Sequence, residues 1–221
     1  MMGDDGNDRG VIFDMDGVLV DSARPHFRSW QRLAAEHGRT VTERQFAETF
    51  GRQNRDIIPL LFGPVPPDRL EALARRKEAI YRDLIRADPP IVEGAVDLVR
   101  GLRERGVRLA VGSSGPRENI ELILSAMEIA DVIDAVVSGD DVSKGKPDPE
   151  VFLRAAEKLG LPPRRCVVVE DAPVGVEAAR RAGCKSVAVL MHHPADRFPQ
   201  PDLTIQRLAD LVPQRLTELI E

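Results

Sequence analysis

The chain has 221 residues, of which 43% are hydrophobic and 30% are charged, and its formal net charge is -5. These values are typical of a packed globular protein and argue against disorder along the chain and against a nucleic acid as partner. Because no apolar stretch approaches the roughly 20 residues that span a membrane, we expect a cytoplasmic protein that does not bind a membrane. We also expect a monomer.

The first predicted element is a buried strand, Gly10 to Phe13, which stops at Asp14. The segment after it contains helical patterns with no strand between them, so it cannot be another layer of a sheet. These patterns cover Pro25 to His37, Thr42 to Phe50, Asp56 to Phe62, and Pro67 to Ile85. The second begins with the capping-box spacing Thr42-x-x-Gln45. We therefore expect an all-helical cap domain over residues 23–90.

After this insert, apolar β-branched runs alternate with amphipathic segments. The runs, which are typical of buried parallel strands, are Val107 to Val111, Val132 to Val137, Cys166 to Val169, and Ser186 to Leu190. The amphipathic segments, each long enough for a crossover helix, are Val96 to Glu104, Glu118 to Met127, Glu150 to Leu159, and Val174 to Ala182. This alternation predicts an α/β core of residues 1–22 and 91–221, with a doubly wound, mainly parallel, Rossmann-like sheet.

Reactive side chains follow the predicted strands and one later loop. They are Asp14, Asp16, Ser113, Ser114, Lys146, Glu170 and Asp171. In an open parallel sheet, ligands collect outside the carboxyl ends of the strands, so these groups should share one edge. Four carboxylates gathered there, with Lys146 the only cation expected nearby, would repel one another strongly unless a metal ion lay among them. Ligands that are all oxygen favour magnesium over zinc.

These residues resemble the motifs of the haloacid dehalogenase superfamily. The matching positions are Asp14-Met15-Asp16-Gly17-Val18, Ser113 after an apolar strand, Lys146-Pro147, and Glu170-Asp171. The resemblance covers nearly the whole chain. It implies that Asp14 attacks phosphorus, that Asp16 is the general acid and base, and that Ser113 and Lys146 bind phosphate. It also implies magnesium ligands at Asp14, at the main-chain carbonyl of Asp16, at Asp171, and at Glu170 directly or through water.

Each motif alone has a structural alternative. Asp-x-Asp-Gly could be a turn, and Ser113 or Ser114 could cap the following helix. Lys146 could be an ordinary loop lysine, and Glu170-Asp171 could be an acidic pair stabilised by a helix dipole. The order of all four motifs, each after a predicted strand or in the expected loop, favours the catalytic interpretation.

The insert offers two further candidates, His26 and Arg55, for contacts with the part of a substrate beyond its phosphate. We predict a magnesium-dependent phosphatase that acts on a small phosphorylated metabolite through an aspartyl phosphate. The alternative is a β-phosphoglucomutase-like sugar-phosphate mutase, because Asp21-Ser22 followed by His26-Phe27-Arg28-Ser29-Trp30 is similar to that enzyme. Against the mutase, residues 50–56 lack the Gly-x-Ser-Arg-x-x-Ser-Leu pattern of its cap loop.

Overall fold

A six-stranded sheet forms the centre of the core in the computed structural model, which describes residues 9–49 and 52–220. Every pairing is parallel, and the order β3-β2-β1-β4-β5-β6 is that of a doubly wound Rossmann-like sheet. The strands are β1 (Gly10–Phe13), β2 (Arg108–Gly112), β3 (Ala135–Val137), β4 (Cys166–Glu170), β5 (Lys185–Val189) and β6 (Leu203–Ile205). The predicted fold class is confirmed.

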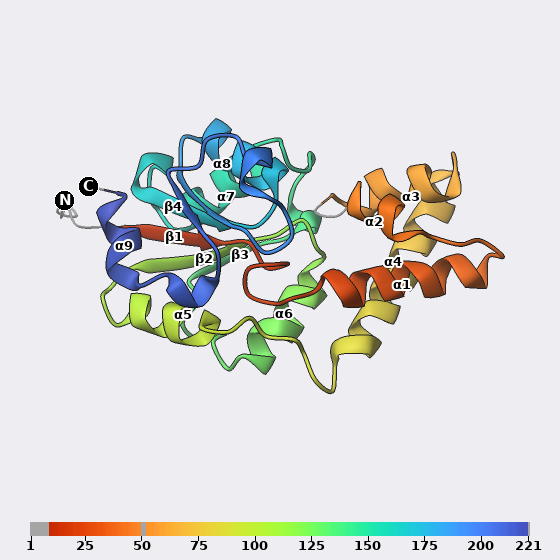
Figure 1. Cartoon of the computed structure of the whole chain (residues 1–221), viewed down its shortest axis with the longest axis horizontal. Helices are drawn as coiled ribbons and strands as arrows, with labels where there is room; N and C mark the ends of the chain where they lie inside the picture. Colours follow the sequence, from red (N-terminus) through yellow and green to blue (C-terminus); the bar gives the residue numbers. More distant parts are fainter. Residues whose placement is uncertain (1–8, 50–51, 221) are drawn as a thin grey trace.

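Helices cover both faces of this sheet because successive side chains of a strand point to opposite faces. Val11 and Phe13 of β1 pack in the cluster beneath α5 (Ala95–Arg103) and α6 (Arg117–Ala126), whereas Ile12 packs on the opposite side. The helices on that opposite side are α7 (Glu150–Lys158) and α8 (Pro173–Ala182), as Figure 1 shows. A buried sheet of this kind holds the loops at its carboxyl edge in fixed positions.

The insert is helical, as predicted, and lies beyond the carboxyl edge of the sheet (Figure 1). Its helices are α1 (Ala23–Glu36), α2 (Glu43–Ala47), α3 (Asn54–Phe62) and α4 (Pro67–Ile85). They enclose an apolar cluster of their own around Trp30, Leu33 and Ile58. The capping box of α2 is present, since Thr42 accepts from the Gln45 N–H at 3.3 Å and donates its own N–H to the Gln45 side chain at 3.0 Å.

The two crossings between cap and core lie side by side. The Asp21 N–H donates to the Pro90 carbonyl at 2.8 Å, and Val20 forms an antiparallel bridge with Ile91. The cap also has an apolar cluster of its own, although Tyr81 and Ile85 near the end of α4 pack in the cluster of the core. The domain boundaries at residues 23 and 90 stay a prediction.

Three sequence predictions differ from the structure. Strand β6 and the last helix, α9 (Pro213–Glu218), were not predicted, because three half-exposed residues in a proline-rich segment carry almost no periodic signal. The strand expected from Val132 begins at Ala135, because the chain is still in a turn at residues 130–132, where the Val132 N–H donates to the Ile129 carbonyl at 3.1 Å. The helix expected to reach Phe50 ends at Ala47, and Phe50 itself lies outside the described residues.

Within the described part of the chain, no helix has the length and apolar character needed to cross a bilayer.

Candidate active site

The acidic motifs meet because β1 and β4 are neighbours in the sheet. Phe13 pairs with Val169, and the Asp14 N–H donates to the Val169 carbonyl at 2.9 Å. Asp14 therefore leaves one strand beside the Glu170-Asp171 pair that ends the other. This is the point at which the strand order reverses, where such sheets bind their ligands.

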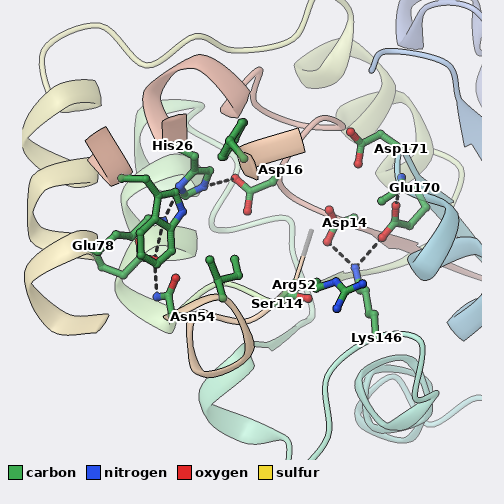
Figure 2. A pocket seen from close by; sticks show the side chains of 16 residues that line it. Asp14, Asp16, His26, Arg52, Asn54, Glu78, Ser114, Lys146, Glu170 and Asp171 are labelled. Carbon is green, nitrogen blue, oxygen red and sulfur yellow. Dashed lines mark hydrogen bonds and ion pairs between the residues drawn. The ribbon is translucent and has the colours of Figure 1, made fainter. Parts of the chain in front are cut away.

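Lys146 comes from a loop before α7 and binds two of these carboxylates. Its Nζ donates to Asp14 Oδ1 and to Glu170 Oε1, each at 2.7 Å, and all three side chains are buried (Figure 2). Burial alone would lower the pKa of Lys146, but Asp14 and Glu170 raise it above its usual range. The lysine is therefore a fixed ammonium beside Asp14.

The positive charge of Lys146 does not balance the negative charges of the carboxylates around it. Burial, with the charges of Glu170 and Asp16 adding to it, raises the pKa of Asp14 to about 7 although Lys146 opposes the shift. Burial, followed by the charges of Glu170 and Asp14, also raises the pKa of Asp171 well above its usual value. The Oδ2 atom of Asp171 is buried without a hydrogen-bond partner. The site is short of positive charge next to Asp171.

A hard cation fits this position. Asp14, Glu170 and Asp171 can each offer one carboxylate oxygen, and these oxygens lie within 4.8 Å of one another. A Cβ built on Gly17, whose φ is +78°, would lie 1.9 Å from Asp171 Oδ2, so a larger residue would displace that oxygen. Oxygen-only donors of this kind suit magnesium. Ligation by the main-chain carbonyl of Asp16 stays a prediction.

Asp16 points toward the cap and contacts the start of α1. The His26 ring lies with Nε2 3.1 Å from Asp16 Oδ1 and Nδ1 2.7 Å from the Nζ of Lys77 (Figure 2). An ammonium can only donate, so Nδ1 accepts and Nε2 carries the proton that is donated to Asp16. Burial would raise the pKa of Asp16, but the interactions with His26, Ser22 and Lys77 together lower that pKa.

A cavity of about 50 Å³ lies between these carboxylates and the cap. Its cap wall contains Trp30, Phe46 and Ile57 together with polar groups, and its core wall includes Ser114 and Gly115. The volume is well below the roughly 300–1,000 Å³ of pockets that enclose whole small ligands. In this closed arrangement the cavity has room for a phosphoryl group and little more.

Comparison with known proteins agrees with this arrangement. Residues 9–183 match the family model of the haloacid dehalogenase-like hydrolases. The chain belongs to this family. The resemblance of its motifs to that superfamily is thereby confirmed, and the protein is an enzyme of the hydrolase type.

Two curated relatives and one solved structure are similar to this chain. A phosphorylated carbohydrates phosphatase of Thermotoga maritima is 34% identical over 82% of this chain and 85% of its own length. A β-phosphoglucomutase of Bacillus subtilis is 31% identical over 95% of this chain and 94% of its own. The crystal structure of a β-phosphoglucomutase from Clostridium difficile has a TM-score of 0.86 at 22% identity, over 96% of this chain and 97% of that one, and supports the fold.

The two serines of this hydrolase occupy different positions. Ser113 is buried, and its Oγ accepts the Gly115 N–H at 3.0 Å, which leaves its own proton available. Ser114 lines the cavity. Neither caps α6, whose N-cap is Pro116 without a side-chain hydrogen bond, so the capping alternative is wrong. Phosphate binding by Ser113 and by Ser114 stays a prediction.

The cap residues of this hydrolase include several that the sequence analysis missed. Arg55 is exposed and lines a neighbouring cavity, whereas Arg52 and Asn54 line the cavity with the carboxylates. Lys77 lies there too, so the expectation that Lys146 is the only nearby cation is wrong. In the sequence, Arg75-Arg76-Lys77-Glu78 has the composition of a solvated helix face. The helical period of α4 places an inward-facing position at Lys77, and the lack of an apolar residue there is the one signal that could have indicated it.

Proposed function

We propose that the protein is a magnesium-dependent phosphatase that hydrolyses a small phosphorylated sugar through an aspartyl phosphate on Asp14. The observation that carries the proposal is the pair of aspartates at one cavity. Asp14 is held beside the Lys146 ammonium, and Asp16 is held by His26 on the cap side. The names of relatives that act on phosphorylated carbohydrates support the substrate class.

In the first step, the Asp14 carboxylate attacks phosphorus and the ester oxygen departs. Asp16 protonates this oxygen, and the negative phosphoryl group beside it favours the protonated form that the step requires. Lys146 holds the attacking carboxylate in place through Asp14 Oδ1. Magnesium bound by Asp14, Glu170 and Asp171 would offset charge on the transferring group.

In the second step, water attacks the aspartyl phosphate. Asp16 gave its proton to the ester oxygen that has departed, so it is ionised and can act as the base. With Oδ1 already accepting from His26, Oδ2 is the oxygen that takes the proton from water. Splitting the displacement in this way replaces one difficult step by two easier ones.

A mutase is the second candidate, because Arg52 of the cap lines the cavity and could contact a second phosphate. It shares Asp14 and Asp16 with the phosphatase and differs only in the group that attacks the phosphoenzyme. Opposing it, the charge of Lys77 is already balanced by Glu78, whose Oε1 lies 2.8 Å from the lysine Nζ. Lys77 is therefore a weaker candidate than Arg52 for contact with a distal phosphate.

The test is a paired assay on one preparation, which follows free phosphate and glucose 6-phosphate together. We expect steady release of phosphate from monophosphate esters, lost in excess chelator and restored by magnesium. We expect little isomerisation of β-glucose 1-phosphate even with a bisphosphate primer. Glucose 6-phosphate formed at tens per second with negligible phosphate release would favour the mutase, and full activity in excess chelator would contradict the metal assignment.

A further inference from the structure

A second, larger cavity between cap and core shares part of its lining with the cavity at the carboxylates. This second cavity has a volume of about 660 Å³. Its walls come from α3 and α4 of the cap and from the start of α6 and residues Gly139-Asp140 of the core. The residues that line both cavities are Asn54, Glu78 and Ser114. Because the first cavity has room for little more than phosphate, a leaving group that extends away from Asp16 must pass these residues.

Glu78 is the charged group at this passage, and it is almost fully buried. Its Oε1 accepts from Asn54 at 2.7 Å and from Lys77 at 2.8 Å, and its Oε2 accepts from Asn119 at 2.6 Å. Burial would raise the pKa of Glu78, but the charge of Lys77 and the other contacts lower it, so the side chain is ionised. A carboxylate has about four acceptor positions. Among the described residues three are used, which leaves one on Oε2.

The rest of the wall suits a carbohydrate. Asn54 adds an amide and Ser114 a hydroxyl beside the carboxylate, in the wall that the two cavities share. Lys77 and Glu78 neutralise each other, so this pair does not itself favour a charged leaving group. We propose that Glu78 is a specificity-determining residue that accepts a hydrogen bond from a hydroxyl of a polyhydroxylated leaving group extending into the second cavity; this rests on the proposed phosphatase function.

Asn119 of the core is the positioning residue for Glu78. It lies on α6, lines neither cavity, and joins the cap helix α4 through Glu78 and through Arg82, whose Nη1 donates to Asn119 Oδ1 at 3.0 Å. Arg82 also pairs with Glu118 at 2.8 Å. The Oε1 atom of Glu78 is thus held within the cap by Asn54 and Lys77, whereas Oε2 is held by a residue of the core.

The experiment compares kcat/KM for fructose 1-phosphate and a hexitol phosphate with kcat/KM for p-nitrophenyl phosphate, whose leaving group carries no additional hydroxyl. In Glu78→Gln, an amide donor replaces an acceptor, so we expect the preference for the sugar esters to fall roughly ten- to a hundredfold, mainly through KM. The pH profile with p-nitrophenyl phosphate should not change. Asn119→Ala, which keeps the Lys77 pair intact, should reduce the preference several-fold. Asp83→Asn, a charge-matched change on the same helix away from both cavities, should leave it unchanged.

Four results would overturn the inference. An equal loss of kcat/KM for all three esters in Glu78→Gln would mean that Glu78 acts on Asp16 through Lys77 and His26. An unchanged preference for the sugar esters in both Glu78→Gln and Asn119→Ala would mean that Glu78 does not contact the leaving group. A wild-type enzyme that hydrolyses p-nitrophenyl phosphate but neither sugar ester would also overturn it while leaving the phosphatase intact. A protein that hydrolyses none of the three would instead refute the proposed function and this inference with it.

Discussion

Replacing Asp14 with asparagine should abolish turnover and also stabilise the metal-free protein. Asparagine keeps the size of the side chain and removes the nucleophile, and the loss of a covalent step should cost several powers of ten in rate. The stability effect has a different origin. Without a metal, burial raises the pKa of Asp14 from 3.8 to about 7, so the ionised side chain opposes folding at neutral pH.

The magnitude follows from that shift. At about 1.36 kcal/mol per pKa unit, the ionised Asp14 costs the metal-free fold at most about 4 kcal/mol at pH 8. Asparagine weakens the contact with Lys146, which lies 2.7 Å from Asp14 Oδ1, so we expect a net gain of about 1–3 kcal/mol. Because the folded-state pKa lies above the unfolded one, the gain should be absent below pH 4, grow up to about pH 7, and level off above it.

The assay is urea unfolding of wild type and variant in excess chelator at pH 5 and pH 8, with phosphate release measured in magnesium on the same preparations. Asp131→Asn, which removes an exposed carboxylate, is the control and should change neither quantity. Turnover above about a tenth of wild type would exclude Asp14 as the nucleophile. A variant less stable than wild type by more than about 1 kcal/mol at pH 8 would refute the electrostatic reasoning.

Three further predictions concern the metal and the cap. Magnesium affinity, measured by calorimetry, should increase between about pH 4 and pH 7, because Asp14 must lose its proton to bind the ion; an affinity independent of pH would contradict this. Gly17→Ala, whose Cβ would lie 1.9 Å from Asp171 Oδ2, should reduce stability by about 1–3 kcal/mol and remove the rise in melting temperature that magnesium causes; an undiminished rise would refute the ligand role of Asp171. Lys77→Met leaves the Glu78 carboxylate buried without its cation and should cost about 3–5 kcal/mol in urea unfolding, and Lys77→Met/Glu78→Gln should recover most of that loss; additive losses would show that the two side chains are not coupled.

The core could be predicted from sequence because its strands are buried on both faces. Runs such as Cys166 to Val169 are then continuously apolar and stand out from the helices between them. The edge strand β6 could not be predicted, since it is only partly buried and three residues long. The helix boundaries were within a few residues throughout, and the capping box of Thr42 and Gln45 located the start of α2.

The cap side of the site could not be predicted from sequence. Lys77 lies 51 residues from His26 in the chain, and only the packing of α1 against α4 brings its Nζ to 2.7 Å from the ring. The sequence also does not show which residues at the start of α3 and in the loop before it face the cavity. For this reason Arg55 was singled out, although Arg52 and Asn54 line the cavity. Gly51, at the start of this loop, lies outside the described residues.

The sequence by itself determined the fold class, the helical insert and the positions of Asp14, Asp16, Lys146 and the Glu170-Asp171 pair. It could do so because parallel strands place whatever follows them at one edge, so chain order alone predicts which groups meet. Only the tertiary structure decided which cap groups face those carboxylates. In the sequence of a charged helix, a lysine that will be buried cannot be distinguished from one that will be exposed. Which lysine is buried depends on the angle at which two helices distant in sequence pack.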